Sequence, residues 1–303
     1  MNELNVFQRN AKYLIIFGVI IGSTSGIFAR LIDASPMAIG LYRMIFALPF
    51  FGLPVLLSAE KRGVLLRYAK KDLIVAFLTA LALYFHYICW FKAVKMTTMA
   101  SAATLESLHP LTVLMVSLLF FKRKVGIKTI VGIAMAIGGS IIVATANNEG
   151  VGLIGSSTVG NGLALLSGIT LGFYFIFGKV ARKNGQRADV FIFVVFLICG
   201  LMFAVTMIAT KDKFIGYTRD DYIYMFAMAM LCQVGAHALF NWSMAYVSDL
   251  YVSTWDTFEG VVGIIIAFFV FSEAPTPIQI LGGIVAFGGL LYYNLNSKAD
   301  WED

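Results

Sequence analysis

Two pairs of ionisable side chains interrupt stretches that are otherwise apolar enough to cross a membrane. Glu106 and His109 form the first pair, and Asp256 and Glu259 form the second. Residues three apart share one face of a helix, so each pair would present its two groups together. A charged side chain costs roughly 2.5 to 3.5 kcal/mol in hydrocarbon, and such groups usually face water in a transport pathway. We therefore expect all four to bind a small-molecule substrate.

Further polar residues fall inside apolar stretches: Arg43, His86, Gln233, His237 and Asn241. The last three recur every four residues and so form one polar stripe on a helix. We expect His86 to bind substrate, and we expect Arg43, His237 and Asn241 to gate the pathway or carry protons, because the ordinary pKa of histidine lies near neutrality. The alternative is structural: Arg43 pairs with Glu106, and the histidines form hydrogen bonds between helices.

Aromatic residues adjoin these polar groups. Tyr87 and Trp90 follow His86 on one apolar stretch, and Trp255 precedes Asp256 on another. The faces of Trp and Tyr rings attract organic cations. We expect Tyr87, Trp90 and Trp255 to line the substrate site. The alternative is a belt of aromatic side chains at the membrane surface.

The elements that hold these residues are apolar stretches that recur along the whole chain. Of its 303 residues, 59% are hydrophobic and 13% are charged, whereas roughly 25% are charged in a soluble domain. About 20 apolar residues cross the hydrocarbon core as a helix. Ten such windows follow one another, at residues 12–32, 36–58, 72–93, 98–121, 127–145, 160–181, 189–210, 221–246, 250–271 and 278–296. The pattern predicts an all-α polytopic membrane protein with ten transmembrane helices.

Basic residues set the expected orientation, because Lys and Arg are enriched in short cytoplasmic loops. With both termini in the cytoplasm, 16 of the 23 Lys and Arg residues fall on the cytoplasmic side and six fall outside. The net charge of +6 is then explained by topology and implies no nucleic-acid partner. The lipid bilayer, with its acidic headgroups, is the expected neighbour.

A weak repeat divides the chain. The first glycine motif is Ile130-x-Gly132-x3-Ala136-x-Gly138-Gly139, and it returns 150 residues later as Ile280-x-Gly282-x3-Ala286-x-Gly288-Gly289. The second motif is Gly22-x3-Gly26, and it returns as Gly168-x3-Gly172. Five spans in each repeat, an odd number, would invert the second repeat relative to the first, as in carriers that open to either side. We expect the first repeat at 1–146, a linker at 147–159 and the second repeat at 160–303.

Pro110 and Gly260 occupy corresponding positions under the 150-residue shift, one residue beyond His109 and Glu259. We expect both helices to be weakened there, because proline lacks a backbone donor and glycine is a poor helix former. Glycine-rich helices pack closely in membranes. The windows 127–145 and 278–296 are therefore expected to form close helix contacts or a homodimer interface.

Several marks, taken in order along the chain, resemble the drug/metabolite transporter superfamily and, within it, the EamA-type ten-helix exporters. They are the Tyr42-Arg43 step, the run from Ala102-Ala103 to Pro110, the two glycine-rich windows, and Phe271-Ser272-Glu273. The resemblance covers nearly the whole chain. It implies a ten-span carrier in the cytoplasmic membrane of a prokaryote, which moves small metabolites, amino acids or drugs by alternating access.

One departure from the family pattern concerns the residue after the fourth helix of each half. The family often places a Glu there. Glu273 fits in the second half, whereas Arg123 stands at the corresponding position of the first half. We therefore expect Glu273 to take part in gating, without a matching Glu in the first half.

These observations predict a secondary active transporter, an exporter or exchanger, for a small cationic or zwitterionic metabolite such as an amino acid or amine. Protons are the expected coupling ion, because burial and nearby charges control the proton affinity of carboxyl groups. A membrane metal-handling protein stays open as the alternative, since Glu106-x-x-His109 is half of a di-iron ligand set. The chain has no recognisable catalytic motif and no phosphate-binding Gly-x4-Gly-Lys loop. The transporter interpretation therefore includes no enzyme activity, cofactor or metal.

Overall fold

Every element in the described part of the chain is a helix, which confirms the all-α prediction. The computed structural model describes residues 11–121, 126–146, 157–236, 239 and 249–297. The helices are α2 (Ala11–Gly22), α3 (Ser25–Leu31), α4 (Pro36–Leu57), α5 (Ala59–Leu66), α6 (Lys70–Met96), α7 (Met99–Glu106), α8 (His109–Phe121), α9 (Ile127–Thr145), α10 (Ser157–Lys183), α11 (Ala188–Thr210), α12 (Arg219–Met228), η1 (Ala229–Ala236), α14 (Asp249–Phe271) and α15 (Pro277–Ser297).

Seven helices among the described residues are long and apolar enough to cross a membrane: Tyr13–Leu31, Pro36–Leu57, Lys70–Met96, Ile127–Thr145, Ser157–Lys183, Ala188–Thr210 and Pro277–Asn296. They match seven of the predicted windows. Of the other windows, 98–121 is divided between α7 and α8, and 221–246 continues beyond the described residues. Window 250–271 forms α14, whose apolar part is Phe258–Phe271. The count of ten spans and the side on which the termini lie stay predictions.

The first apolar stretch bends between α2 and α3. Ser23 Oγ donates to the carbonyl of Ile20 at 2.8 Å, and Thr24 Oγ1 donates to the carbonyl of Ile21 at 2.5 Å. Hydroxyl groups that bond to the preceding turn compete with the backbone and bend helices. The prediction of one uniform helix over 12–32 misses this α2–α3 bend.

The stretch 98–121 breaks between α7 and α8, next to the proline that predicted a weak point. Ser107 Oγ donates to the carbonyl of Ala103 at 2.7 Å, and Pro110 has no N–H with which to continue the helix. The corresponding helix α14 runs unbroken through Gly260. The predicted weak point at Gly260 therefore does not interrupt α14, because glycine keeps the backbone donor that proline lacks.

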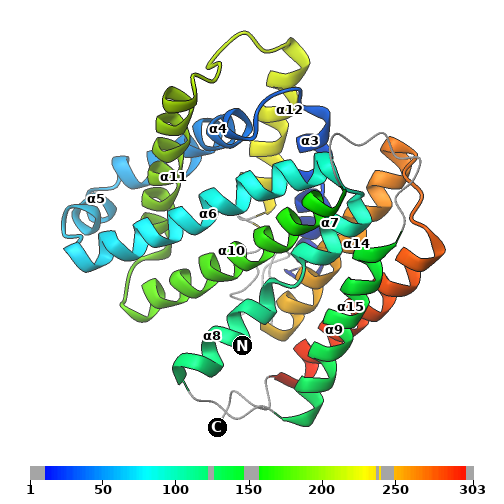
Figure 1. Ribbon diagram of the computed structural model, residues 1–303. Coiled ribbons are helices and arrows are strands. Elements are labelled where there is room, and N and C mark those ends of the chain that lie inside the picture. Colours follow the sequence, from blue (N-terminus) through cyan, green and yellow to red (C-terminus); the bar gives the residue numbers. More distant parts are fainter. Residues whose placement is uncertain (1–10, 122–125, 147–156, 237–238, 240–248, 298–303) are drawn as a thin grey trace.

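The two predicted repeats interleave instead of forming separate bundles. Figure 1 shows α6 and α10 side by side through the centre, α9 paired with α15, and α4 beside α11, and these three pairs have the most extensive contacts among the described helices. Each pair takes one helix from each predicted repeat. The interfaces between these paired helices are therefore formed by both halves of the chain.

The contact between α9 and α15 depends on glycine. A Cβ added at Gly132 would lie 2.7 Å from Tyr293 N, and one at Gly282 would lie 2.9 Å from Gly139 O. Such distances leave no room for a side chain, so the two helices pack backbone to backbone, as we predicted for these windows. The predicted homodimer through these helices has no support, because the closely packed glycines are already covered within one chain.

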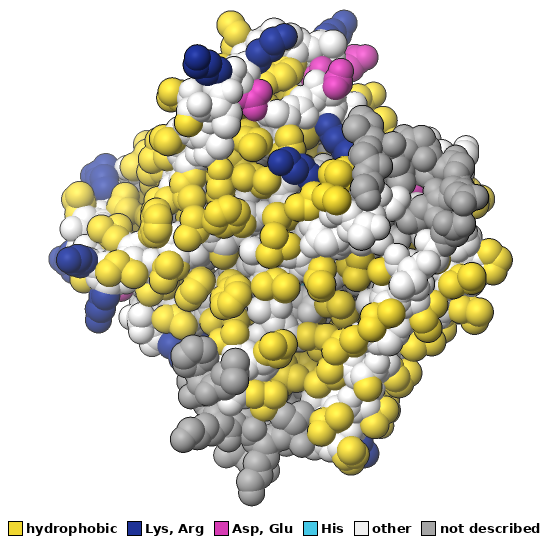
Figure 2. Space-filling view, in the orientation of Figure 1, with side chains coloured by type: hydrophobic (Ala, Val, Ile, Leu, Met, Phe, Trp, Pro, Cys, Tyr) yellow, Lys and Arg dark blue, Asp and Glu magenta, His cyan; other side chains and the backbone are white. Residues whose placement is uncertain are grey.

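The outer surface of the bundle is apolar. Phe269 is 77% exposed and Ile284 is 66% exposed, with many other large hydrophobic side chains. Figure 2 shows hydrophobic side chains over most of one face, with most of the Lys, Arg, Asp and Glu toward its margins. Soluble monomers rarely expose apolar patches of this size. The surface suits contact with acyl chains.

Candidate functional site

The stretch α7–α8, which carries Glu106 and His109, crosses α14, which carries Asp256 and Glu259, close to these residues. A Cβ added at Gly260 would lie 2.9 Å from Ser107 Oγ. Ser107 directly follows Glu106, and Gly260 directly follows Glu259. The break between α7 and α8 therefore meets the middle of α14, and the structure brings the Glu106 and Glu259 segments together.

Glu106 and His109 lie on either side of the break, against α10. Glu106 ends α7 and His109 begins α8. A Cβ at Gly168 would lie 2.6 Å from Glu106 O, and one at Gly172 would lie 2.9 Å from His109 O. Gly168 and Gly172 thus leave room on α10 for the backbone at the α7–α8 break. The His109 ring also packs on Phe175, with centroids 5.4 Å apart.

Glu259 faces the α2–α3 bend. A Cβ added at Gly22, the last residue of α2, would lie 3.2 Å from Glu259 Oε1. Asp256 lies about one helical turn away on α14, but its side chain is outside the described part of the structure. The predicted gating residues His237 and Asn241 also lie outside the described residues.

His86 forms a hydrogen bond between helices, which was the structural alternative to substrate binding. Its Nδ1 lies 2.9 Å from Ser167 Oγ, across the interface of α6 and α10. His86 is 7% exposed, and its ring packs beside that of Tyr87, with ring centroids 5.2 Å apart. This histidine therefore connects the packed α6–α10 interface with the polar interior.

The two candidate tryptophans lie in packed surroundings. Trp90 lies against α3, where a Cβ at Gly26 would be 3.1 Å from its Cζ2. Trp255 is partly buried on α14 and packs on Phe258, with ring centroids 5.8 Å apart. A role for either ring in substrate binding stays a prediction.

Arg43 is buried, and it does not form the pair with Glu106 that was the structural alternative. It is 5% exposed. Its Nε donates to Gln233 Oε1 at 2.8 Å, and its Nη1 donates to Ser25 Oγ at 2.9 Å. Its guanidinium carbon lies 4.6 Å from the centroid of the Tyr87 ring, whose hydroxyl also donates to Gln233 Oε1, at 2.7 Å. We call Ser25, Arg43, Tyr87 and Gln233 the Arg43 cluster.

Glu273 joins the two halves at one end of the bundle, which is the predicted outer end. Its carboxylate forms an ion pair with Arg30 and accepts the backbone N–H of Met99, the first residue of α7. Arg30 Nε also donates to Val94 O at 2.7 Å, and Arg30 Nη2 donates to Thr97 O at 3.0 Å. We call these five residues the Glu273 cluster. It fastens α3, α6 and α7 to the segment that follows α14.

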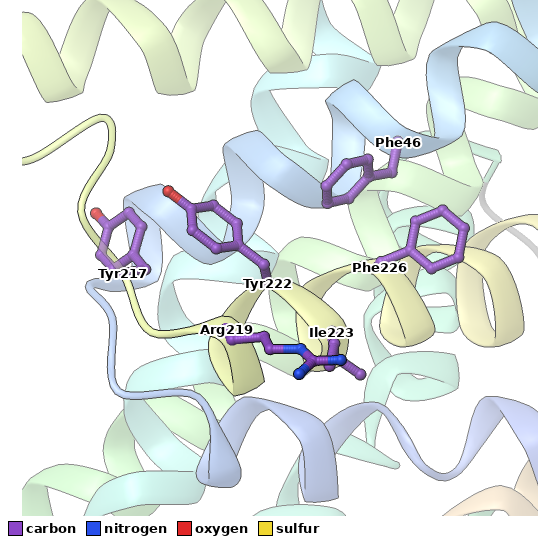
Figure 3. Close-up of a pocket in the computed structure, with 6 residues that line it drawn as sticks. All are labelled: Phe46, Tyr217, Arg219, Tyr222, Ile223 and Phe226. Carbon is purple, nitrogen blue, oxygen red and sulfur yellow. The ribbon is translucent and has the colours of Figure 1, made fainter.

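A surface groove of about 610 Å³ lies apart from these clusters, between α4 and α12 (Figure 3). Its lining is mostly aromatic: Phe46, Tyr217, Arg219, Tyr222, Ile223 and Phe226. Tyr42 packs beside it, with its ring centroid 5.4 Å from that of Tyr222. The side chain of Tyr42 therefore packs with this outer aromatic group, whereas the side chain of the next residue, Arg43, lies in the interior.

Two residues of the Arg43 and Glu273 clusters were not predicted as functional from the sequence. Ser25 belongs to the polar run 23–25 inside an apolar window, and that interruption is a signal of a functional position. Arg30 stands within the same window, where a charge is costly without a partner. Its partner Glu273 is 243 residues away in the chain, which spacing alone does not reveal.

The metal-handling alternative gains no support from the described ranges. Among those residues, no group of three or more His, Cys, Asp or Glu side chains comes together in a way that could hold a metal ion. A di-iron site would need additional carboxylate and histidine ligands around Glu106 and His109.

Comparisons with known proteins give matches along nearly the whole chain. The family model described as "EamA-like transporter family" matches residues 10–145 and again residues 158–295. A protein of Archaeoglobus fulgidus, named as an uncharacterized transporter, is 23% identical over 291 residues, which are 94% of this chain and 96% of that protein. One solved crystal structure aligns with a TM-score of 0.66 and 16% identity, over 96% of this chain and 98% of its own. That alignment shows a shared fold alone.

Proposed function

Because the chain belongs to the EamA-like transporter family, we propose that it is a secondary active transporter which exports or exchanges a small cationic or zwitterionic metabolite, such as an amino acid or amine. Family membership makes the protein an integral transporter of the cytoplasmic membrane and not an enzyme. The family model matches each half separately. This supports ten spans in two inverted repeats, 1–146 and 160–303, which open alternately to the two sides of the membrane.

The observation that carries the proposal is the crossing of the broken helix with α14. Interrupted helices near the midplane are typical of substrate sites in secondary transporters, because the freed backbone groups line a cavity. Here the interruption separates Glu106 from His109, and it meets α14 beside Glu259. The proposed substrate site therefore takes groups from both halves of the chain.

The packing of α7 and α8 supports alternating access. The segment α7 packs against α6, α9, α10, α14 and α15, whereas α8 packs extensively only on α10 among the described helices. Figure 1 shows α8 directed away from α9 and α15. The Glu273 cluster lies at the α7 end, so we propose that it is the closed gate of this state and that the pathway opens at the α8 end.

Proton coupling follows from the chemistry of the acidic pairs. A carboxylate binds an ammonium group or a proton, and both ligands neutralise its charge. Glu106, Asp256 and Glu259 would hold the substrate in one open state and exchange it for protons in the other. His109 and His237 would relay protons, because imidazole titrates near neutral pH.

A ligand screen tests the proposed function. Amino acids, simple amines and nucleosides are added separately to the detergent-purified protein, and the melting temperature is measured. At a ligand concentration 100 times Kd, binding to the folded state adds about 2.7 kcal/mol to the free energy of unfolding. We expect stabilisation by compounds with an ammonium group, followed by uptake of the same compounds into proteoliposomes. Stabilisation by nucleosides alone would contradict the proposal.

A further inference from the structure

Within the part of the chain that the structure describes, no carboxylate contacts the guanidinium group of Arg43. Arg43 belongs to none of the ion pairs found there, such as those of Arg30, Lys61 and Arg187. The hydrogen-bond partners of Arg43 are the neutral side chains of Gln233 and Ser25. A buried cation is stable only when opposite charge or good acceptors compensate it. The described carboxylates therefore leave this buried charge available to an anionic ligand.

Gln233 supplies a second, independent sign of a missing acceptor. It is fully buried, and its Oε1 accepts hydrogen bonds from Arg43 Nε and from the hydroxyl of Tyr87. Because Arg Nε is only a donor, these bonds fix which way the amide points. Among the described residues, Gln233 Nε2 then has no hydrogen-bond partner. A buried donor without an acceptor is costly and rare.

The helix geometry around Gln233 is also unusual. The segment Ala229–Ala236 is a π-helix that continues α12. Such segments are rare and are often found at functional sites. Here the π-helix turns Gln233 toward Arg43 of α4 and Tyr87 of α6. The backbone therefore supports the placement of an unsatisfied donor beside a guanidinium group.

Glu259, on α14, lies against the same α2–α3 bend that Arg43 contacts. Its carboxyl group meets α2 at Gly22, whereas Arg43 bonds to Ser25, the first residue of α3. Cys232, which directly precedes Gln233, contacts the bend between these two residues, with its thiol 3.4 Å from Thr24 Oγ1. A carboxylate and a set of cationic and amide donors thus stand at neighbouring points of one interior region.

We propose that Arg43 and Gln233 bind the carboxylate of the transported substrate while Glu259 binds its ammonium group. This inference rests on the proposed transport function and makes its substrate a zwitterion of the α-amino-acid kind. Guanidinium groups bind carboxylates strongly and with defined geometry. The amide of Gln233 adds a donor that a simple amine cannot use. The site therefore selects for the carboxylate as well as for the ammonium group.

The first test uses the unmodified protein. Each of the common amino acids is compared with its α-amide and its decarboxylated amine, which keep the ammonium group but lack the carboxylate, by thermal shift in detergent. We expect at least one amino acid to bind roughly tenfold or more tightly than both analogues, because they leave the buried donors unsatisfied. Equal affinity for the acid and its analogues would overturn this inference and leave the transport function standing. Absence of any ligand with an ammonium group would overturn both.

The second test uses Arg43→Gln and Gln233→Leu. We expect each variant to bind the selected amino acid roughly tenfold or more weakly while its affinity for the α-amide stays unchanged. A purely structural role would instead weaken both ligands equally. The control is Gln186→Leu, which alters a glutamine that contacts Asp72 far from the cluster and should leave both affinities unchanged. Should Arg43→Gln not fold, Gln233→Leu and the comparison of ligands in the unmodified protein decide the question.

Discussion

Glu259→Gln is expected to abolish uptake driven by a pH gradient in proteoliposomes. Glutamine matches the shape of glutamate and keeps the fit against Gly22, where Oε1 lies 3.2 Å from the position of an added Cβ. It cannot, however, release or accept the proton that coupling requires. We expect the initial rate of pH-driven uptake to fall to that of protein-free liposomes.

The same variant separates coupling from substrate binding. A hydrogen bond to a charged group contributes about 1.5 to 3 kcal/mol, so the loss of the Glu259 charge should weaken binding roughly tenfold or more. Exchange between internal and external substrate at saturating concentration should persist, since it needs no net proton movement. The control is Glu60→Gln, because Glu60 is 75% exposed on α5 and pairs with Arg187 at the surface. Undiminished pH-driven uptake by Glu259→Gln would end the coupling proposal.

Glu273→Ala is expected to open the end of the bundle that the Glu273 cluster closes. The side chains of Arg30 and Glu273 are only 14% and 5% exposed, and removal of one partner from a buried pair costs about 3 to 5 kcal/mol. Since each 1.4 kcal/mol is a factor of about ten in an equilibrium, the population should shift roughly a hundredfold or more toward the state open at this end.

Thiol labelling measures this shift. Ser101 is fully buried next to the Glu273 cluster, so Ser101→Cys should react slowly with a water-soluble maleimide and much faster once Glu273→Ala is added. Asp189→Ala is the matched control, because its pair with Lys61 is at the surface, where ion pairs contribute about 0 to 1 kcal/mol. The native buried Cys199 reports general unfolding. An unchanged rate at position 101 would show that the cluster is not a gate.

Hydropathy predicted most of the helices because the cost of polar groups in lipid is local and additive along a segment. The seven described helices that are long and apolar enough to cross a membrane follow from composition alone. The break beside Pro110 was also predictable, since the loss of a backbone donor is a property of one residue. The bend at Ser23 and Thr24 was not predicted, because it depends on hydroxyl groups that choose the preceding carbonyls over other partners.

Contacts between distant segments were beyond a single sequence. The depth of Arg43 indicated a functional group, but its partner Gln233 is 190 residues away, on a π-helix that no hydrophobic pattern predicts. The glycine motifs indicated close packing of 127–145 and 278–296 without showing that these helices would pack on each other. In each case the partner is set by how the two halves interleave, and composition does not determine that arrangement.

In the proposed carrier, acidic groups from both halves face one water-filled pathway. The most direct measurement is the reaction of Glu106→Cys and Glu259→Cys with a membrane-impermeant maleimide, in protein whose native cysteines have been replaced. Phe269→Cys is the reference for a lipid-facing position, because Phe269 is 77% exposed on the apolar surface. We expect positions 106 and 259 to react from the same side of the membrane and position 269 to stay unreactive. If neither position reacts from either side of the membrane, the acidic groups do not line a water-filled pathway.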